Sequence, residues 1–264
     1  MSSLPDNSQR ALPTAPKGCQ TRLTDRTGGP AIQTVSLSVF RFDRRRDRLW
    51  ALGQMALARR DFAAMDGCSF WKLCGSGTGE GFTPRPNTAV WAILAVWNDP
   101  CTARDRVAQA PVFDRWRDRA GTDLTLFLSP VSATGAWSGR EPFHPGPSGP
   151  GPLAALTRAR IRGRHLRRFW GRVPDISERI GADPNVLFKI GIGEVPWRNQ
   201  ITFSVWPDAE AMARFARTGP HAEAIRAVRE NGWFSEELYA RFRVTGESGA
   251  WDGIPRLAPT AEAA

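Results

Sequence analysis

The chain has 264 residues, of which 41% are hydrophobic, and its 36 Lys and Arg outnumber 26 Asp and Glu to give a net charge of +10. This composition is typical of a globular protein, and no apolar run approaches the roughly 18 residues of a membrane-spanning helix. Most of the positive charge is arginine. It indicates either a solvated helix surface or an anionic partner: a lipid surface, an acidic protein, cofactor propionates or a nucleic acid.

The first segment, residues 1–32, is rich in Pro, Ser, Thr and Gly and is expected to be a disordered extension. It lacks the hydrophobic stretch of a secretory signal, which predicts a cytoplasmic protein. The whole chain has no GxSxG elbow, no HExxH pair and no CxxC among its four cysteines. Serine-hydrolase and zinc-enzyme chemistry therefore have no support.

The first predicted strand covers residues 34–40, where Val35, Leu37 and Val39 alternate with serines. The following segment, 45–62, has helical spacing. The apolar positions that we expect to face the core are Leu49, Leu52, Met55 and Ala56.

Four glycines, at 75, 77, 79 and 81, follow the next predicted strand and suggest a phosphate-binding loop. However, Pro84 and Pro86 come directly after them, and the sequence continues as TAVWAILAVW, a β-branched and aromatic run typical of a buried strand. There is no GK[ST] ending. The segment therefore predicts a connection between two strands rather than a cofactor cradle.

A helix is predicted from about residue 100 to Ala120, followed by a strand over DLTLFLSPV. Residues 138–152 form a Pro/Gly-rich linker. Near the end of the chain, ELYARFRV predicts a strand with one apolar face. That face comprises Leu238, Ala240, Phe242 and Val244.

The chain repeats itself across the linker. Trp97 aligns with Trp206, Lys72 with Lys189, and GAWSG with GAWDG, in the same order. The first half is about eight residues longer, and the extra length falls in the glycine-rich segment. This asymmetry predicts either a mobile lid over a hydrophobic cleft or a plain surface hairpin.

Each half is predicted as strand, helix, strand, strand, helix, strand, which is the ferredoxin-like motif. The fold class is therefore α+β: two tandem βαββαβ repeats packed face to face as an intramolecular dimeric α/β barrel. We expect a first half over residues 33–137, the linker over 138–152, a second half over 153–257, and a disordered tail over 258–264.

Several long strings resemble one protein family. They include FWKLCGSGTGEGFTP, DPNVLFKIGIGEVP, RFWGRVPDIS and WPDAEAMARFARTGPHAEAIRAVRENGWFSEELYARF. Over residues 32–257 the chain resembles the spheroidene monooxygenase family, the acyclic carotenoid 2-ketolases of purple phototrophic bacteria. The N-terminal extension is not part of the resemblance.

This resemblance implies an enzyme with haem b that takes O₂ and electrons from a 2Fe–2S ferredoxin. It implies insertion of oxygen at C-2 of spheroidene-type carotenoids to give 2-ketones such as spheroidenone. The partners implied are a carotenoid substrate, the ferredoxin donor and peripheral contact with the inner face of the photosynthetic membrane. The oligomeric state stays open.

Histidine is the commonest iron ligand in haem proteins, and the chain has three. His221 is the preferred ligand, because it falls on the sheet-facing stripe of a predicted helix and the repeat places apolar Val112 at the same position of the first half. His165, in an arginine-rich helix start, is the second candidate near the haem edge. His144 lies in the linker, and Cys74 is a further alternative.

Lys72 and Lys189 stand in strongly apolar surroundings, where an unpaired ammonium is costly. Each is predicted either to pair with an acidic neighbour or to reach a haem propionate. Two other functions remain open: a non-catalytic haem or carotenoid carrier, and a ferredoxin-like RNA-binding module. The second is disfavoured because glycines stand where stacking aromatics are needed, so no nucleic acid is expected.

Overall fold

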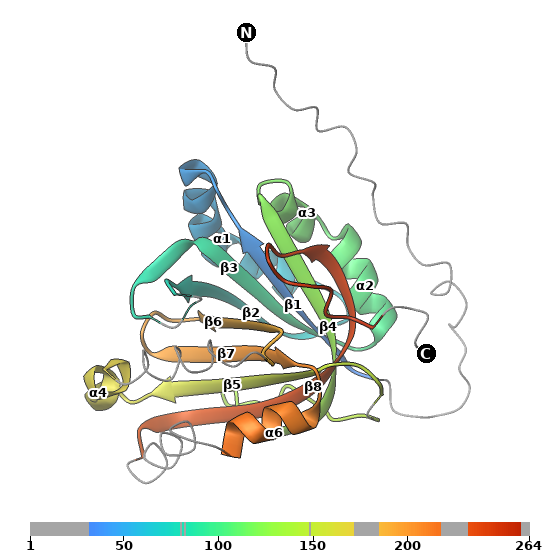
Figure 1. Ribbon diagram of the computed structural model, residues 1–264. Coiled ribbons are helices and arrows are strands. Elements are labelled where there is room, and N and C mark those ends of the chain that lie inside the picture. The colour runs from blue at the N-terminus through green and yellow to red at the C-terminus, as the bar shows by residue number, and fades with distance from the viewer. Residues whose placement is uncertain are drawn as a thin grey trace.

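The computed structural model describes residues 32–79, 81, 83–147, 149–171, 185–217 and 232–259 (Figure 1). Its elements in chain order are β1 (Thr34–Arg41), α1 (Arg45–Ala63), β2 (Cys68–Gly77), β3 (Pro86–Trp97), α2 (Pro100–Gln109), α3 (Pro111–Arg117), β4 (Thr122–Gly135), β5 (Leu153–Ile161), the 3-10 helix η1 (Gly163–His165), α4 (Leu166–Trp170), β6 (Phe188–Gly193), β7 (Asn199–Trp206), α6 (Ala209–Arg217) and β8 (Phe234–Ala250).

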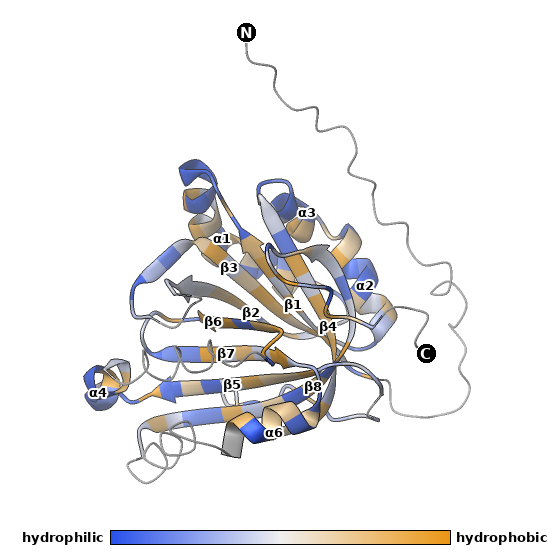
Figure 2. Ribbon diagram, in the orientation of Figure 1, coloured by the Kyte–Doolittle hydropathy of each residue, from blue (hydrophilic) through white to orange (hydrophobic). Residues whose placement is uncertain are grey.

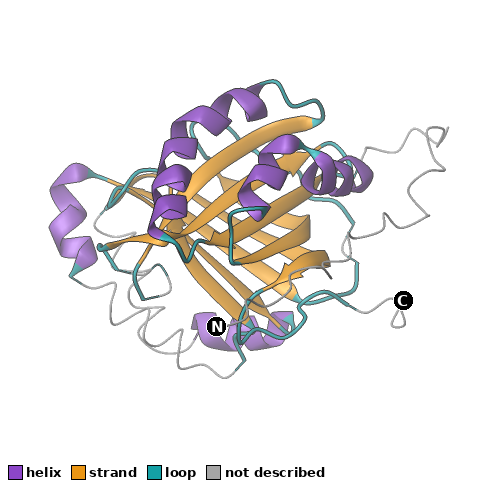
Figure 3. Ribbon diagram, turned by 90° about the horizontal axis from the view of Figure 1, so that it is seen from above, coloured by secondary structure: helices purple, strands orange, loops and turns teal. Residues whose placement is uncertain are grey.

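The strands form one closed barrel in the order β1-β3-β2-β6-β7-β5-β8-β4. Every pairing is antiparallel. The helices lie outside the strands, with α1, α2 and α3 over the strands β1 to β4 (Figures 1 and 3). The predicted α/β barrel is thus confirmed as an eight-stranded antiparallel barrel. In the described part of the chain, no helix has the length and hydropathy needed to cross a bilayer.

The barrel interior is filled by alternate residues of all eight strands, as the strand period of two requires. Val35, Leu37 and Val39 of β1 are each 1% exposed or less and belong to this interior cluster. All four predicted apolar positions of β8 belong to it as well. The predicted core faces of both strands are confirmed, and Figure 2 shows the hydrophobic residues concentrated along the strands.

The helix α1 buries a different face from the predicted one. Its buried residues are Asp47, Ala51, Gln54, Ala58 and Phe62. Leu49 and Leu52 are instead 71% and 52% exposed, and of the four predicted positions Met55 alone packs against the core. The outer face of the sheet beneath α1 already carries large aromatic rings, such as Trp71, whose centroid lies 5.6 Å from that of Phe62, so short alanines fit against it and leucines do not.

The single helix predicted up to Ala120 is also wrong, because Pro111 divides it into α2 and α3. Proline has no backbone N–H and pushes the preceding residue out of the helical region. Accordingly, Ala110 has φ −74° and ψ 131° and caps both helices.

The barrel is closed unequally at the two places where its halves meet. On one side, β4 pairs with β8 along almost its whole length, from Asp123 opposite Ala250 to Gly135 opposite Leu238. On the other side, β2 and β6 share only two pairs, which involve Gly75 and Ser76 of β2. We call this second side the seam.

Candidate functional site

Lys72 and Lys189 do not occupy matching positions, so the alignment between them is wrong by one residue. The valines that precede the two aligned tryptophans pair with Phe70 and with Phe188. Lys72 is two residues after Phe70 and faces the barrel interior, whereas Lys189 directly follows Phe188 and faces outward.

Lys189 lies beside a cavity of about 380 Å³ at the seam. Most of the cavity wall is apolar, and Val90, Phe188 and Trp251 contribute to it. The full lining is Ser76, Asn87, Val90, Val186, Leu187, Phe188, Lys189, Ile190, Trp251, Asp252 and Ile254. An apolar cavity with a few polar groups is the usual form of a small-molecule site.

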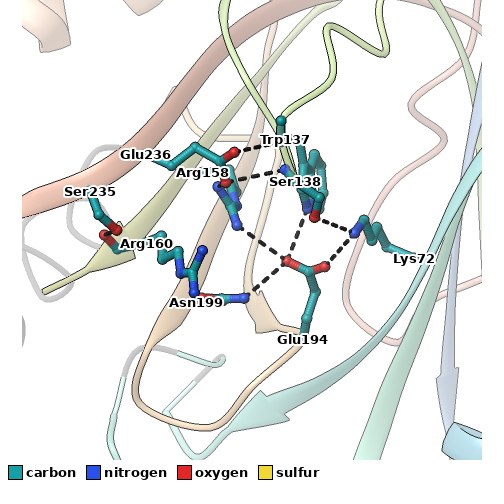
Figure 4. Close-up of polar contacts among 10 residues, drawn as sticks. Lys72, Trp137, Ser138, Arg158, Arg160, Glu194, Asn199, Ser235 and Glu236 are labelled. Carbon is teal, nitrogen blue, oxygen red and sulfur yellow. Dashed lines mark hydrogen bonds and ion pairs between the residues drawn. The ribbon is translucent and has the colours of Figure 1, made fainter. Parts of the chain in front are cut away.

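Lys72 belongs to a buried cluster of charges inside the barrel (Figure 4). Its Nζ lies 2.8 Å from Oε1 of Glu194. The other oxygen of this carboxylate, Oε2, lies 3.7 Å from the guanidinium of Arg158. Arg158 pairs in addition with Glu236. The Trp137 indole donates a hydrogen bond of 2.9 Å to Glu194. The paired alternative predicted for Lys72 is therefore the one found, and the cofactor-binding role predicted for it stays untested.

Backbone amides complete the cluster around Glu236. The N–H groups of Ser138 and Gly139 donate to its carboxylate at 3.1 and 2.7 Å. Burial alone would raise the pKa of Glu236, but the Gly139 amide, the Arg158 guanidinium and the Ser138 amide together hold it below its usual range. The carboxylate is thus kept ionised opposite Arg158.

This charged cluster joins the two halves of the chain across the barrel end. Lys72 and Trp137 come from the first half, while Arg158, Glu194 and Glu236 come from the second. Sequence reasoning missed the last three, although Arg158 continues the inward alternation of Ala154 and Leu156. Burial and Glu194 also raise the pKa of the neighbouring Cys74 thiol well above its ordinary value, so this alternative iron ligand is a protonated core residue.

The glycine-rich segment connects β2 to β3, as predicted, and crosses the seam to lie against the second half. Gly81 packs directly on Gly191 of β6, and its carbonyl accepts a 3.4 Å hydrogen bond from Gln200. The Trp197 indole donates to the carbonyl of Pro84 at 2.6 Å. Trp197 has a φ of +63°, a left-handed conformation that a bulky residue rarely adopts. Whether this segment works as a lid remains a prediction.

A methyl group at Gly81 should displace the glycine-rich segment from β6, because a Cβ there would overlap the carbonyl of Gly191. Gly81→Ala is expected to leave the far-UV circular dichroism unchanged while proteolysis within residues 77–85 becomes faster. The matched control is Gly253→Ala, which has a similar positive φ of +75° but open space around the added methyl. Equal proteolysis rates in both variants would contradict the seating of Gly81 on β6.

The structure describes two of the three histidines, His144 and His165. His165 ends η1, stacks on Trp233 with ring centroids 6.1 Å apart, and accepts a hydrogen bond from Arg164. Burial and the nearby arginines lower its pKa. His144 is exposed, and its amide donates to Gln33. His221 lies outside the described residues.

The outer faces of the two halves differ in side-chain size. In the first half, Trp91, Ile93 and Trp97 of β3 belong to a large cluster beneath α1, α2 and α3. In the second half, the described outer cluster contains four buried residues around α6, namely Leu153, Trp206, Ala211 and Met212. By strand alternation, the remaining outward positions include the small Thr157 and Thr202 and the larger Tyr239.

Curated relatives match most of the chain. A spheroidene monooxygenase of Rhodobacter capsulatus is 53% identical over 229 residues, which are 85% of this chain and 95% of that protein. Another, from Cereibacter sphaeroides, is 52% identical over 226 residues, 84% of this chain and 70% of the relative. The chain belongs to the spheroidene monooxygenase family. A third spheroidene monooxygenase, from Rubrivivax gelatinosus, is 32% identical over 78% of this chain and 80% of its own.

Solved structures support the fold of this family member. One crystal structure of aldoxime dehydratase aligns with a TM-score of 0.56 and 13% identity, covering 84% of this chain and 83% of that one. A second, in complex with butyraldoxime, gives a TM-score of 0.57 at 11% identity, covering 81% and 80%. At these identities the likeness shows a shared fold alone. No family model matches the chain.

Proposed function

We propose that this protein is a haem-dependent monooxygenase that oxidises C-2 of spheroidene-type acyclic carotenoids to a 2-ketone. The observation that carries the proposal is the identity above 50% to two proteins named spheroidene monooxygenase, over 84–85% of the chain. The described geometry adds an apolar cavity at the seam and small outward side chains at Thr157 and Thr202 of the second half.

We propose that a planar macrocycle lies on the outer sheet surface of the second half. Thr157 of β5 and Thr202 of β7 present short side chains there, whereas the outer cluster of the first half contains Trp91 and Ile93 of β3. We propose His221 as the residue that holds the iron. Val112, which the repeat aligns with His221, is 1% exposed in α3 and packs on the first-half sheet. Haem, when bound, supplies the activation of O₂.

We propose that Lys189 meets a propionate of that haem. It faces outward on β6, on the same side of the sheet as Thr202, and it lines the seam cavity. Lys72 faces the interior and pairs with Glu194. We therefore propose a cofactor contact for Lys189 and a structural role for Lys72, in place of equal roles for the two.

Two successive monooxygenations at C-2 account for the 2-ketone. In each step a C–H bond at C-2 becomes C–OH, O₂ is reduced, its second oxygen atom leaves as water, and two electrons and two protons are taken up. We propose ferredoxin as the electron source. The geminal diol formed after the second step loses water to give the ketone. The protein must therefore hold C-2 in place and exclude bulk water, for which the apolar seam cavity is suited.

We also propose that the two halves are copies of one ferredoxin-like unit, bounded at residues 33–137 and 153–257. The pairing pattern supports this, because β1 pairs with β3 and β4 while β5 pairs with β7 and β8. In this arrangement the second copy has gained the cofactor surface, and the first copy has kept a filled outer core.

Production of the protein in a spheroidene-making bacterial host tests the function. With oxygen, 2-keto carotenoids are expected to accumulate, and chromatography with mass spectrometry detects their added oxygen. In ¹⁸O₂ the oxygen atom newly inserted at C-2 should carry the label, provided that extraction is fast enough to limit exchange of the ketone with water. Equal ketone yield without O₂ would contradict a monooxygenase. Haem and carotenoid binding without any ketone would instead favour a carrier.

A further inference from the structure

The outward side of α1 is an apolar surface open to solvent. Leu49, Leu52 and Leu57 are 71%, 52% and 60% exposed. Gly53 and Ala56 lie between them and are also exposed. With 3.6 residues per turn, all five fall on one side of the helix. A Cβ at Gly53 would meet no atom within 4 Å, so nothing described covers this side.

Exposed arginines bracket this surface at both ends of α1. Arg44, Arg45 and Arg46 precede the first leucine, and Arg59 and Arg60 follow the last. By contrast, Asp47 is a residue of a type that usually faces water, but it is buried beneath the helix. It is 5% exposed and pairs with Arg119. The helix therefore presents its apolar and cationic residues outward together.

We propose that this surface, defined by Leu49, Leu52, Leu57 and the five bracketing arginines, docks on an anionic lipid bilayer. The leucines enter the boundary between headgroups and acyl chains, and the arginines contact lipid phosphates. The proposal rests on the proposed function in one respect: a polyene substrate is apolar enough to reside in a bilayer. It names the surface by which the enzyme reaches that substrate.

The charge pattern favours lipid over a second copy of this chain. If two α1 helices packed together, an antiparallel arrangement would set Arg45 and Arg46 against Arg59 and Arg60, and a parallel one would set each arginine against itself. Either arrangement brings like charges together, which disfavours association. The residue types also favour lipid over a protein, because leucine is under-represented at the energetic centres of protein interfaces.

Vesicle flotation with the full-length protein tests the proposal. We expect binding to vesicles of phosphatidylcholine mixed with phosphatidylglycerol, weak binding to phosphatidylcholine alone, and loss of binding as salt rises. Leu49→Gln/Leu52→Gln/Leu57→Gln should weaken binding roughly tenfold or more. Glutamine is a good helix former, so α1 should stay folded. As a control, Val195→Gln alters another exposed apolar residue, at 48%, and should bind like the unmodified protein.

Three results would overturn the proposal. The first is equal vesicle binding by the triple variant and the unmodified protein. The second is equal binding of the unmodified protein to neutral and anionic vesicles. The third is a triple variant that binds vesicles normally but no longer dimerises or no longer turns over with ferredoxin, which would assign the surface to a protein partner. Flotation needs neither haem nor turnover. Oxidation of detergent-dispersed carotenoid, measured separately, therefore tests the proposed function independently of the docking surface.

Discussion

Replacing Glu194 by glutamine is expected to destabilise the protein by about 3–5 kcal/mol, the usual cost of breaking a buried ion pair by removing one charge. Lys72 and Arg158 both face this carboxylate, and their side chains are only 16% and 2% exposed. In the variant, two cations stay buried with one fewer counter-charge. Denaturant unfolding, followed by circular dichroism, measures the loss.

The matched control is Glu210→Gln, which breaks an ion pair on the surface. Glu210 pairs with Arg214 one helical turn away, and its side chain is 80% exposed. Such pairs contribute about 0.3–0.5 kcal/mol. If the two variants unfold at the same denaturant concentration, the buried cluster does not stabilise the barrel as its geometry indicates. If Glu194→Gln does not fold, Lys72→Met in the same background should restore part of the stability by removing the uncompensated cation.

His221→Ala is expected to yield a folded protein without its haem absorption. In the proposed function His221 supplies the bond between protein and iron. Of the other two histidines, His165 stacks on Trp233 and His144 is exposed. Absorption spectra of the purified variant, ferric and ferrous with CO, measure haem content directly. Far-UV circular dichroism checks that the fold is retained.

His165→Ala and His144→Ala are the comparison variants, and both should keep the haem spectrum of the unmodified protein. Normal haem content and an unchanged ferric spectrum in His221→Ala would move the assignment to His165. Because absorbance is read without substrate or reductant, the result is independent of whether the carotenoid reaction proceeds.

The strands of this barrel could be predicted from sequence because each has one fully buried face. The alternation in β1 and β8 is regular, and the predicted inward residues are those found inside. The same pattern fails for α1, since helical spacing shows that an apolar side exists but not where it faces. The aromatic residues beneath α1 come from other parts of the chain, and Ala51 and Ala58 are among the residues of α1 that are buried against them.

The charged cluster could not be predicted from sequence for a related reason. Its members are spread from Lys72 to Glu236, and only barrel closure brings them together. Two lysines in similar local sequences also face opposite sides of the barrel wall. Lys72 lies two residues after the residue that pairs with Val96, and Lys189 lies one residue after the residue that pairs with Val205. These pairings with β3 and β7 are not visible in the chain.

The unequal closure of the barrel has a consequence for its motions. Strands held by many hydrogen bonds open together with the whole fold, whereas a junction held by few opens locally at much lower free energy. Because β4 is paired with β8 along almost its whole length while β2 and β6 are joined by two residue pairs, the seam is where backbone amides are expected to lose protection first. If the barrel opens locally between β2 and β6, a long, stiff polyene can enter sideways through that opening. Its end then does not have to pass through the open end of the barrel.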